Sequence, residues 1–398
     1  MIYHLIDWFS SSLDIPGAGL MHYLSFRAML AAVISMITAY FAGRKIIKLL
    51  QRKQIGETIR DLGLEGQMQK KGTPTMGGVI IIIALLTGAL LVCRLDSIYT
   101  ILLIVTTLWC GGIGFADDYI KVFKHNKEGM SAKGKLLLQF GLGLLIALVV
   151  CISPDIHSDN LVTTIPFVKE HEFDYSWLSP FKGQLGVYCS WGIYMLMIII
   201  VILACSNGTN LTDGMDGLAS GTSAIVGVTL GVIAWLSGDA LKSDYLNIMH
   251  IPGAGEVAIF LSAFVGALLG FLWFNTYPAQ VFMGDTGSLT IGGIIGVSAV
   301  LIRKELLLPL LCGIFLMESL SVLIQRYWFK YTKKKYGEGR RVFLMAPLHH
   351  HFQKDADPTA KVLWNKPING IPESKITIRF WIVGILLACL TFVTLKIR

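Results

Sequence analysis

Long apolar runs alternate with polar loops along the chain. A helix needs roughly 17–25 apolar residues to cross a bilayer, where only helices and closed barrels satisfy their backbone hydrogen bonds. These runs are continuous and lack the residue-by-residue alternation of barrel strands, so they indicate helices. The pattern predicts an all-α polytopic membrane protein with about ten transmembrane helices, near residues 22–43, 76–93, 97–116, 134–152, 186–205, 218–236, 257–274, 288–302, 305–325 and 377–396.

Composition excludes a soluble protein. The 398 residues are 54% hydrophobic and 15% charged, whereas soluble domains carry about 25% charged residues. Residues 1–398 are therefore expected to form a single integral membrane domain, in which residues 1–20 are an interfacial or partly spanning segment. The seven cysteines are scattered, without a CxxC pair, and are interpreted as buried apolar side chains.

The distribution of charge predicts the orientation. The net charge is +8, and the basic residues concentrate in the first, third and ninth loops. Basic residues collect in the cytoplasmic loops of membrane proteins, so the excess does not indicate nucleic-acid binding. The odd-numbered loops, including the long loop 326–376, are expected in the cytoplasm, and the long loop 153–185 and both termini in the periplasm. The pair Arg303–Lys304 departs from this rule.

The five odd-numbered loops also carry dense polar motifs, whereas the even-numbered loops have nothing comparable. The motifs read KKGTPTMGG (70–78), FADDYIK (115–121), NGTNLTDGMDGLA (207–219), FNTYPAQVFMGDTGSL (274–289) and MAPLHHHF (345–352). Because all five lie on one side of the predicted membrane, they indicate a single site at the cytoplasmic boundary.

Adjacent carboxylates close the third run. Asp117 and Asp118 lie one helical turn before Lys121. Side chains of adjacent residues diverge on a helix, so one carboxylate is expected to face the reacting centre and the other to position a ligand or a metal ion. The alternative is a helix terminus with an ordinary i,i+4 ion pair.

The fifth and seventh loops add further carboxylates. Asn210, Asp213 and Asp216 are spaced to line one face of a helix start. Asp285 lies between two glycines before an apolar run, and with Asn275 it offers the oxygen ligands that Mg²⁺ prefers. In both loops, helix capping without further function is the alternative.

Histidines at 349, 350 and 351 are consecutive, so they cannot all point to one site. We interpret one or two of them as hydrogen-bond donors to phosphate or nucleoside, with a metal site or a solvent-facing run as alternatives. Glu318 lies inside the ninth run, where an ionisable residue indicates function by default. Here it is interpreted as protonated or paired with a neighbouring helix, apart from the motif loops.

The residue types together favour phosphoryl chemistry on a lipid. Carboxylates suit Mg²⁺, and lysines and glycines suit phosphate. Phosphoryl transfer depends mainly on charge neutralisation and positioning. At a membrane boundary, a lipid headgroup meets a water-soluble phosphorylated donor.

The five motifs, in this order over about residues 40–395, resemble the family of polyprenyl-phosphate N-acetylhexosamine-1-phosphate transferases. The TPTMGG and HHH forms favour the branch with a muramoyl-pentapeptide donor. The resemblance implies transfer of phospho-MurNAc-pentapeptide from UDP-MurNAc-pentapeptide to undecaprenyl phosphate, giving lipid I and UMP, with Mg²⁺ as cofactor. It also implies the first membrane step of peptidoglycan synthesis, in the bacterial inner membrane, commonly by a homodimer.

Residue by residue, the resemblance implies Mg²⁺ on Asp285, Asp117 and Asp118, with Asn275 close by. Asp117 would be the base for the lipid phosphate, and His349 would complete the catalytic set with the three aspartates. The other matched residues would bind substrate: on the uridine side Lys70, Asn210, Asp213, Asp216 and Phe282, and on the phosphate side Lys121, Lys133, His350 and His351, with Thr75 from the first motif. A two-step route through an aspartyl-phosphate on Asp285 is the chemical alternative to direct attack.

Two other functions stay open from the sequence. A transferase of the same family that uses UDP-N-acetylglucosamine would share most motifs, and an assay with both donors would distinguish it. A transporter with polar hinge loops is disfavoured, because the runs hold almost no ionisable residues and no internal repeat is evident.

Overall fold

The structure, a computed structural model, describes residue 3 and residues 18–52, 72–124, 126, 128–153, 156, 161–168, 172–357, 359 and 361–395. The predicted segment 1–20 lies largely outside these residues, and Lys70 lies wholly outside them. The elements are η1 (Ala18–His22), α2 (Leu24–Arg52), α3 (Gly78–Val92), α4 (Ile98–Phe123), α5 (Ala132–Ile152), β1 (Val162–Thr164), β2 (Glu172–Asp174), η3 (Tyr175–Leu178), α6 (Gly183–Thr212), α7 (Leu218–Ser237), α8 (Ala240–Leu246), α9 (Ala254–Asn275), α10 (Gly284–Leu301), η4 (Glu305–Leu307), α11 (Leu308–Leu311), α12 (Gly313–Tyr336), β3 (Arg341–Phe343), α13 (Leu348–Gln353), β4 (Val362–Trp364) and α14 (Glu373–Thr394).

The all-α prediction is confirmed. Nine of the ten predicted runs are single helices, and the run 305–325 is broken into two helical parts that meet at 76°. Among the described helices, eight are long and apolar enough to cross a membrane, the bent pair brings this to nine, and α3 is shorter at 15 residues. All seven cysteines are free, but the prediction that they are buried holds for only four, because Cys151 and Cys189 are half-buried and Cys389 is exposed.

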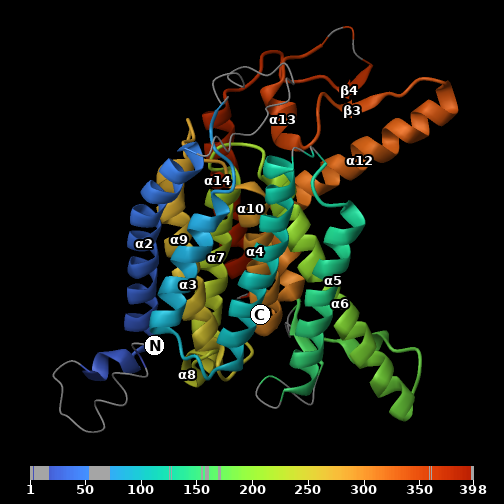
Figure 1. The fold of residues 1–398 in the computed structure, drawn as a ribbon. Helices are drawn as coiled ribbons and strands as arrows, with labels where there is room; N and C mark the ends of the chain where they lie inside the picture. The colour runs from blue at the N-terminus through green and yellow to red at the C-terminus, as the bar shows by residue number, and fades with distance from the viewer. Residues whose placement is uncertain are drawn as a thin grey trace.

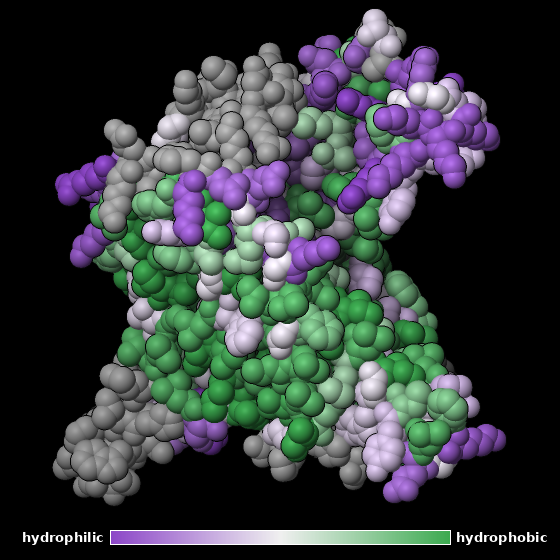
Figure 2. Space-filling model, turned by 45° about the vertical axis from the view of Figure 1, so that its right-hand side comes forward, coloured by the Kyte–Doolittle hydropathy of each residue, from purple (hydrophilic) through white to green (hydrophobic). Residues whose placement is uncertain are grey.

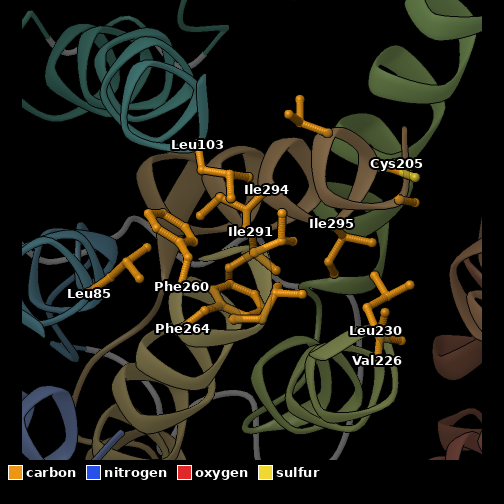
Figure 3. Close-up of a cluster of buried hydrophobic side chains, with 14 of the residues drawn as sticks. Leu85, Leu103, Cys205, Val226, Leu230, Phe260, Phe264, Ile291, Ile294 and Ile295 are labelled. Atoms are coloured by element: carbon orange, nitrogen blue, oxygen red, sulfur yellow. The ribbon is translucent and has the colours of Figure 1, made fainter. Parts of the chain in front are cut away.

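Helix α10 lies at the centre of the bundle, packed against α3, α4, α6, α7 and α9 (Figure 1). Every residue from Thr286 to Leu301 is buried, as expected for a helix that is apolar on all sides. Figure 3 shows α10 side chains among those of its neighbours, with labels on Leu85, Leu103, Cys205, Val226, Leu230, Phe260, Phe264, Ile291, Ile294 and Ile295. This packing holds the first turn of α10, which carries Asp285, in one place.

The described residues of all five polar motifs lie at one end of the bundle, the upper end in Figure 1. Figure 2 shows a broad hydrophobic band around the middle of the visible face, with hydrophilic side chains gathered above it. The prediction that the motifs share one side of the protein is confirmed. We call this the motif end.

At the opposite end, β1 and β2 of the loop 153–185 form an antiparallel hairpin that contacts Arg303 and Lys304. Thr164 N donates to Arg303 O (3.1 Å), and Lys304 Nζ donates to Thr164 Oγ1 (2.6 Å). Both basic side chains are buried, and burial lowers the pKa of Lys304 to about 8. The pair departs from the charge rule because it packs inside the protein instead of lying on the surface.

At the motif end, α12 projects from the bundle and carries α13 and the parallel pair β3–β4 (Figure 1). Phe343 of β3 is in register with Trp364 of β4. The Gln325 amide of α12 accepts from Val342 N (2.9 Å) and Phe343 N (3.0 Å) and donates to Phe343 O (3.0 Å). The predicted loop 326–376 thus begins only after Tyr336, where α12 ends, and the Gln325 side chain ties it to the bent helix.

Candidate active site

Three aspartates from two helices converge at the motif end. Asp117 and Asp118 lie in the last two turns of α4, and Asp285 lies in the first turn of α10. One carboxylate oxygen from each lies within 4.8 Å of the others. Gly114 permits this approach, because a Cβ there would lie 2.2 Å from the Asp285 carbonyl oxygen. The predicted convergence of these aspartates is confirmed.

Asp117 is fully buried and surrounded by donors. Its Oδ2 lies 2.6 Å from Lys121 Nζ, which is the predicted i,i+4 pair, and its Oδ1 lies 2.9 Å from Lys135 Nζ. Met130 N donates a further hydrogen bond to Oδ1 (2.7 Å). Burying a carboxylate is costly in free energy unless such partners surround it. Asp117 therefore organises both lysines and the loop between α4 and α5.

Asp118 binds the first turn of α10. Its Oδ1 accepts from Asp285 N (3.1 Å), and its Oδ2 accepts from Thr286 N (2.9 Å) and Thr286 Oγ1 (2.6 Å). These N–H groups have no partner within their own helix, so Asp118 caps α10 from a neighbouring helix. Gly284, at φ +73°, leaves room for it, since a Cβ there would lie 2.6 Å from Asp118 Oδ2.

Asp285, in α10, contacts side chains from three other helices, α4, α5 and α6. Lys135 Nζ donates to its Oδ2 (2.6 Å), and Lys121 Nζ lies 3.2 Å from the same atom. Asn210 Nδ2 donates to its Oδ1 and to Ser288 Oγ, both at 2.9 Å. The side chains of Lys121 and Lys135 are 36% and 21% exposed, so the cluster reaches solvent through the lysines.

The chemistry of this cluster suits a cation and an anion together. Its carboxylates are hard oxygen ligands of the kind that divalent cations such as Mg²⁺ take. Its two ammonium groups are compact point charges suited to phosphate. The cluster could therefore hold a divalent metal ion beside a phosphorylated ligand.

The prediction that Asn210, Asp213 and Asp216 line one face of a helix start is wrong. Helix α6 continues to Thr212, so Asn210 is in its last turn and Asp213 follows it directly. The helix extends beyond the apolar run because its last turns pack against α10 and α12. Asp216 lies before α7, where its Oδ2 accepts from Ala279 N (3.0 Å). Asn210 reaches the aspartates, whereas Asp216 joins the fifth loop to the seventh.

The first and seventh loops pair through their backbones. Phe282 N donates to Pro74 O, and Gly77 N donates to Phe282 O, both at 2.8 Å. Thr75 is buried between them, and a Cβ on Gly284 would lie 3.2 Å from its hydroxyl oxygen. This pairing places Thr75 beside the start of α10, while the Phe282 side chain is half-buried.

Asn275, expected close to the metal ion, holds two loops together. Its Oδ1 accepts from Gly217 N and Ser220 Oγ, both at 3.1 Å, and its Nδ2 donates to Val281 O (3.0 Å). The side chain is buried. These contacts indicate that Asn275 positions the seventh loop against the start of α7.

Lys135 is the contact that sequence reasoning missed. Lys133, the predicted phosphate contact, is exposed, whereas Lys135 bridges Asp117 and Asp285. Residues two apart on a helix point to nearly opposite sides. One feature of the sequence could have indicated Lys135. Gln139, four residues later, is a polar residue in an apolar run, and it is buried on the same face of α5 as Lys135.

His349 and Glu318 form a buried pair. His349 Nδ1 lies 3.2 Å from Glu318 Oε2, and His349 N donates to Glu318 Oε1 (3.2 Å). The prediction that Glu318 lies apart from the motif loops is wrong, because α13 packs directly against α12. Glu318 therefore positions His349, whose Nε2 faces Gly214; a Cβ on this glycine would lie 2.2 Å from that nitrogen.

The histidine triplet divides as predicted, with two members inward. His351 is buried, its ring lies 4.7 Å from that of Trp364, and its Nδ1 accepts from Leu344 N (3.1 Å). Burial lowers the pKa of His351, so it is a neutral core residue near pH 7. His350 is half-buried. In the described part of the chain, His349 lies against Glu318 of α12 and Gly214, whereas the partners of His351 lie in and beside β3–β4.

Comparison with known proteins identifies the class to which this protein belongs. Glycosyl transferase family 4 matches residues 100–303, which include all three aspartates. The phospho-N-acetylmuramoyl-pentapeptide-transferase signature 1 matches residues 70–82, in the first motif. The protein is thus a membrane-embedded transferase.

Similarity over complete chains narrows the class further. Phospho-N-acetylmuramoyl-pentapeptide-transferases of Parabacteroides distasonis, Porphyromonas gingivalis and Flavobacterium johnsoniae are 55%, 52% and 49% identical to this chain, over 100% of both sequences in each case. The chain belongs to glycosyl transferase family 4 and, within it, to the phospho-N-acetylmuramoyl-pentapeptide-transferases. The resemblance seen in the motifs is confirmed, and the protein is a multi-pass protein of the bacterial inner membrane.

Proposed function

We propose that the chain transfers phospho-MurNAc-pentapeptide from UDP-MurNAc-pentapeptide to undecaprenyl phosphate, giving lipid I and UMP, in a Mg²⁺-dependent reaction. One observation carries the proposal: Lys121 and Lys135 bridge the carboxylates of Asp117 and Asp285 at one end of a membrane bundle. Phosphoryl transfer needs mainly such positioned charge. The names of the full-length relatives support the substrate class.

In the proposed reaction, an oxygen of the lipid phosphate attacks the β-phosphorus of the donor. A P–O bond forms there while the bond from the β-phosphorus to the bridging oxygen breaks, and UMP leaves with the electron pair. Asp117 orients the acceptor phosphate and takes up its proton when it arrives protonated. Lys121 and Lys135 neutralise charge on the diphosphate.

Direct attack is favoured over a covalent intermediate on Asp285. Both oxygens of Asp285 already accept contacts, from Asn210 on one side and from the two lysines on the other. In the proposed direct attack, these contacts hold Asp285 in one orientation, where it organises charge and forms no bond to phosphorus. Radiolabelled phospho-sugar retained on the protein without lipid acceptor would contradict direct attack.

The residues at the site fit Mg²⁺. We propose that Asp285 and Asp117 hold the ion and that Asp118 fixes the backbone of Asp285 through its three hydrogen bonds. When bound, the ion supplies Lewis-acid stabilisation for the diphosphate and for the departing UMP. We further propose that the motif end faces the cytoplasm, in line with its basic loops, and that the protein acts as a homodimer.

Release of UMP from UDP-MurNAc-pentapeptide tests the function. With the full chain in detergent, we expect release to require both undecaprenyl phosphate and Mg²⁺ and to stop when EDTA removes the ion. UDP-N-acetylglucosamine serves as the control donor and should give no release. Comparable turnover of the control donor, or full activity in EDTA, would contradict the proposal.

Substitution Gly214→Ala tests whether His349 takes part. The new Cβ would lie 2.2 Å from His349 Nε2, so the imidazole must shift. A misplacement of about 1 Å at a reacting centre can cost about 100-fold in rate, and we expect kcat to fall by about 10- to 100-fold. Gly231→Ala is the matched control, because its Cβ would lie 3.5 Å from Leu261, an ordinary contact. Unchanged kcat in both variants would remove His349 from the mechanism.

A further inference from the structure

A pocket at the motif end is formed by α2, α9 and the loop that follows α9, and it shares no residue with the aspartate cluster. Its volume is about 360 Å³, and it is lined by Arg44, Ile47, Lys48, Gln51, Trp273, Phe274 and Gln280. The first four residues belong to α2 and are spaced i, i+3, i+4 and i+7. This spacing places them on one face of the helix.

The pocket lies where the apolar part of α2 ends. The apolar run closes at Gly43, and basic residues begin at Arg44. Gly43 lets α2 approach α9 closely, because a Cβ there would lie 2.5 Å from the Phe274 ring. The pocket therefore lies at the depth where lipid hydrocarbon gives way to headgroups.

Aromatic side chains pack against a basic residue of the pocket. The Arg44 guanidinium lies 4.4 Å from the centre of the Tyr40 ring, and this ring contacts Trp273 at 5.9 Å and Phe274 at 6.1 Å. Trp273 is 67% exposed on the outside of the bundle. Exposed tryptophan is typical of the membrane interface, where its apolar ring and its N–H meet different surroundings.

The lining combines positive charge with apolar surface. It holds two basic side chains and two amides, and none of the described residues that line it is acidic. Ile47, Trp273 and Phe274 provide the apolar wall. Two cations that form no ion pair with any described residue attract an anion, and an apolar wall open to the lipid favours an anion that carries acyl chains.

We propose that this pocket binds the phosphate headgroup of an anionic phospholipid in the leaflet at the motif end. Arg44 and Lys48 contact the phosphate, the amides of Gln51 and Gln280 contact its polar substituent, and Trp273 lies along the glycerol and acyl chains. The bound lipid is a resident of the membrane, separate from the substrate that reacts at Asp117 and Asp285.

Native mass spectrometry of the full chain, delipidated in detergent and titrated with phosphatidylglycerol, tests the proposal. Each basic residue near an anionic headgroup contributes roughly a fivefold factor in affinity. The double variant Arg44→Gln, Lys48→Gln should therefore bind roughly 25-fold more weakly. The matched control Lys45→Gln, Arg52→Gln removes the same charge from the flank of α2 and should bind like the wild type. UMP release should be unchanged in both variants.

Gln51→Glu provides a second variant that keeps both cations and adds a carboxylate to the pocket, and it should also weaken binding of phosphatidylglycerol. Equal binding by the wild type and both pocket variants would overturn the proposal, as would equal affinity for phosphatidylcholine. Displacement of phosphatidylglycerol by undecaprenyl phosphate at much lower concentration would assign the pocket to the acceptor and overturn its assignment to a resident lipid.

Discussion

Asp117→Asn is expected to lower kcat by at least about a hundredfold, the range found when a general base is removed, with little change in the KM for the donor. The amide keeps the shape of the side chain but loses the charge that pairs with Lys121 and Lys135 and the ability to take up a proton. Because these losses concern the reacting phosphate more than the nucleoside, the effect should appear in kcat. Steady-state UMP release at varied donor concentration measures both constants.

The matched control for this prediction is Asp239→Asn. Asp239 begins α8 at the opposite end of the bundle and pairs with Lys242 on the surface. The same chemical change there should leave kcat within about twofold of the wild type, since exposed ion pairs contribute little. Turnover near normal in Asp117→Asn would exclude Asp117 as the base.

Lys135→Gln is expected to lower kcat/KM by about 10²- to 10³-fold, the usual cost of removing one preorganised charge contact from a site. Lys135 Nζ lies 2.9 Å from Asp117 and 2.6 Å from Asp285, so it bridges the two carboxylates and approaches Asp285 more closely than Lys121, which lies 3.2 Å away. Without it, the carboxylates repel each other and one positive charge for the diphosphate is lost. Lys133→Gln, two residues away and exposed, should remain close to the wild type.

Thermal unfolding of the same variants separates catalysis from folding. In Lys135→Gln, Asp117 keeps Lys121 and the Met130 N–H as partners, so we expect the melting temperature to change by a few degrees at most. A large loss of stability, or equal losses of activity in the variants of Lys133 and Lys135, would contradict the role given to Lys135.

Much of the fold could be predicted because a bilayer imposes simple requirements. The apolar runs had to be helices, and the structure confirms nine of them as single elements. The run 305–325 is broken at Cys312, with a bend of 76°. Hydropathy indicates whether a segment can lie in lipid, but it says nothing about the direction of the helix axis. The bend could therefore not be predicted from the sequence.

The active site was predictable in its residue types but not in its contacts. The motifs identified Asp117, Asp118 and Asp285, and their proximity is confirmed. The sequence did not single out Lys135 as a lysine that reaches the aspartates, nor Glu318 as the partner of His349, for one reason. Each depends on which side of a helix faces a neighbour far away in the sequence.

The sequence by itself determined the class of protein, the helical spans, the shared end of the polar motifs and the aspartates, because hydropathy, charge and motif order are local properties of the chain. Only the tertiary structure decided which lysines bridge Asp117 and Asp285, that Asp118 caps α10, that Glu318 holds His349, and that α2 and α9 enclose a basic pocket. These contacts arise from helix packing at glycines such as Gly114, where backbones approach within the space of a missing side chain.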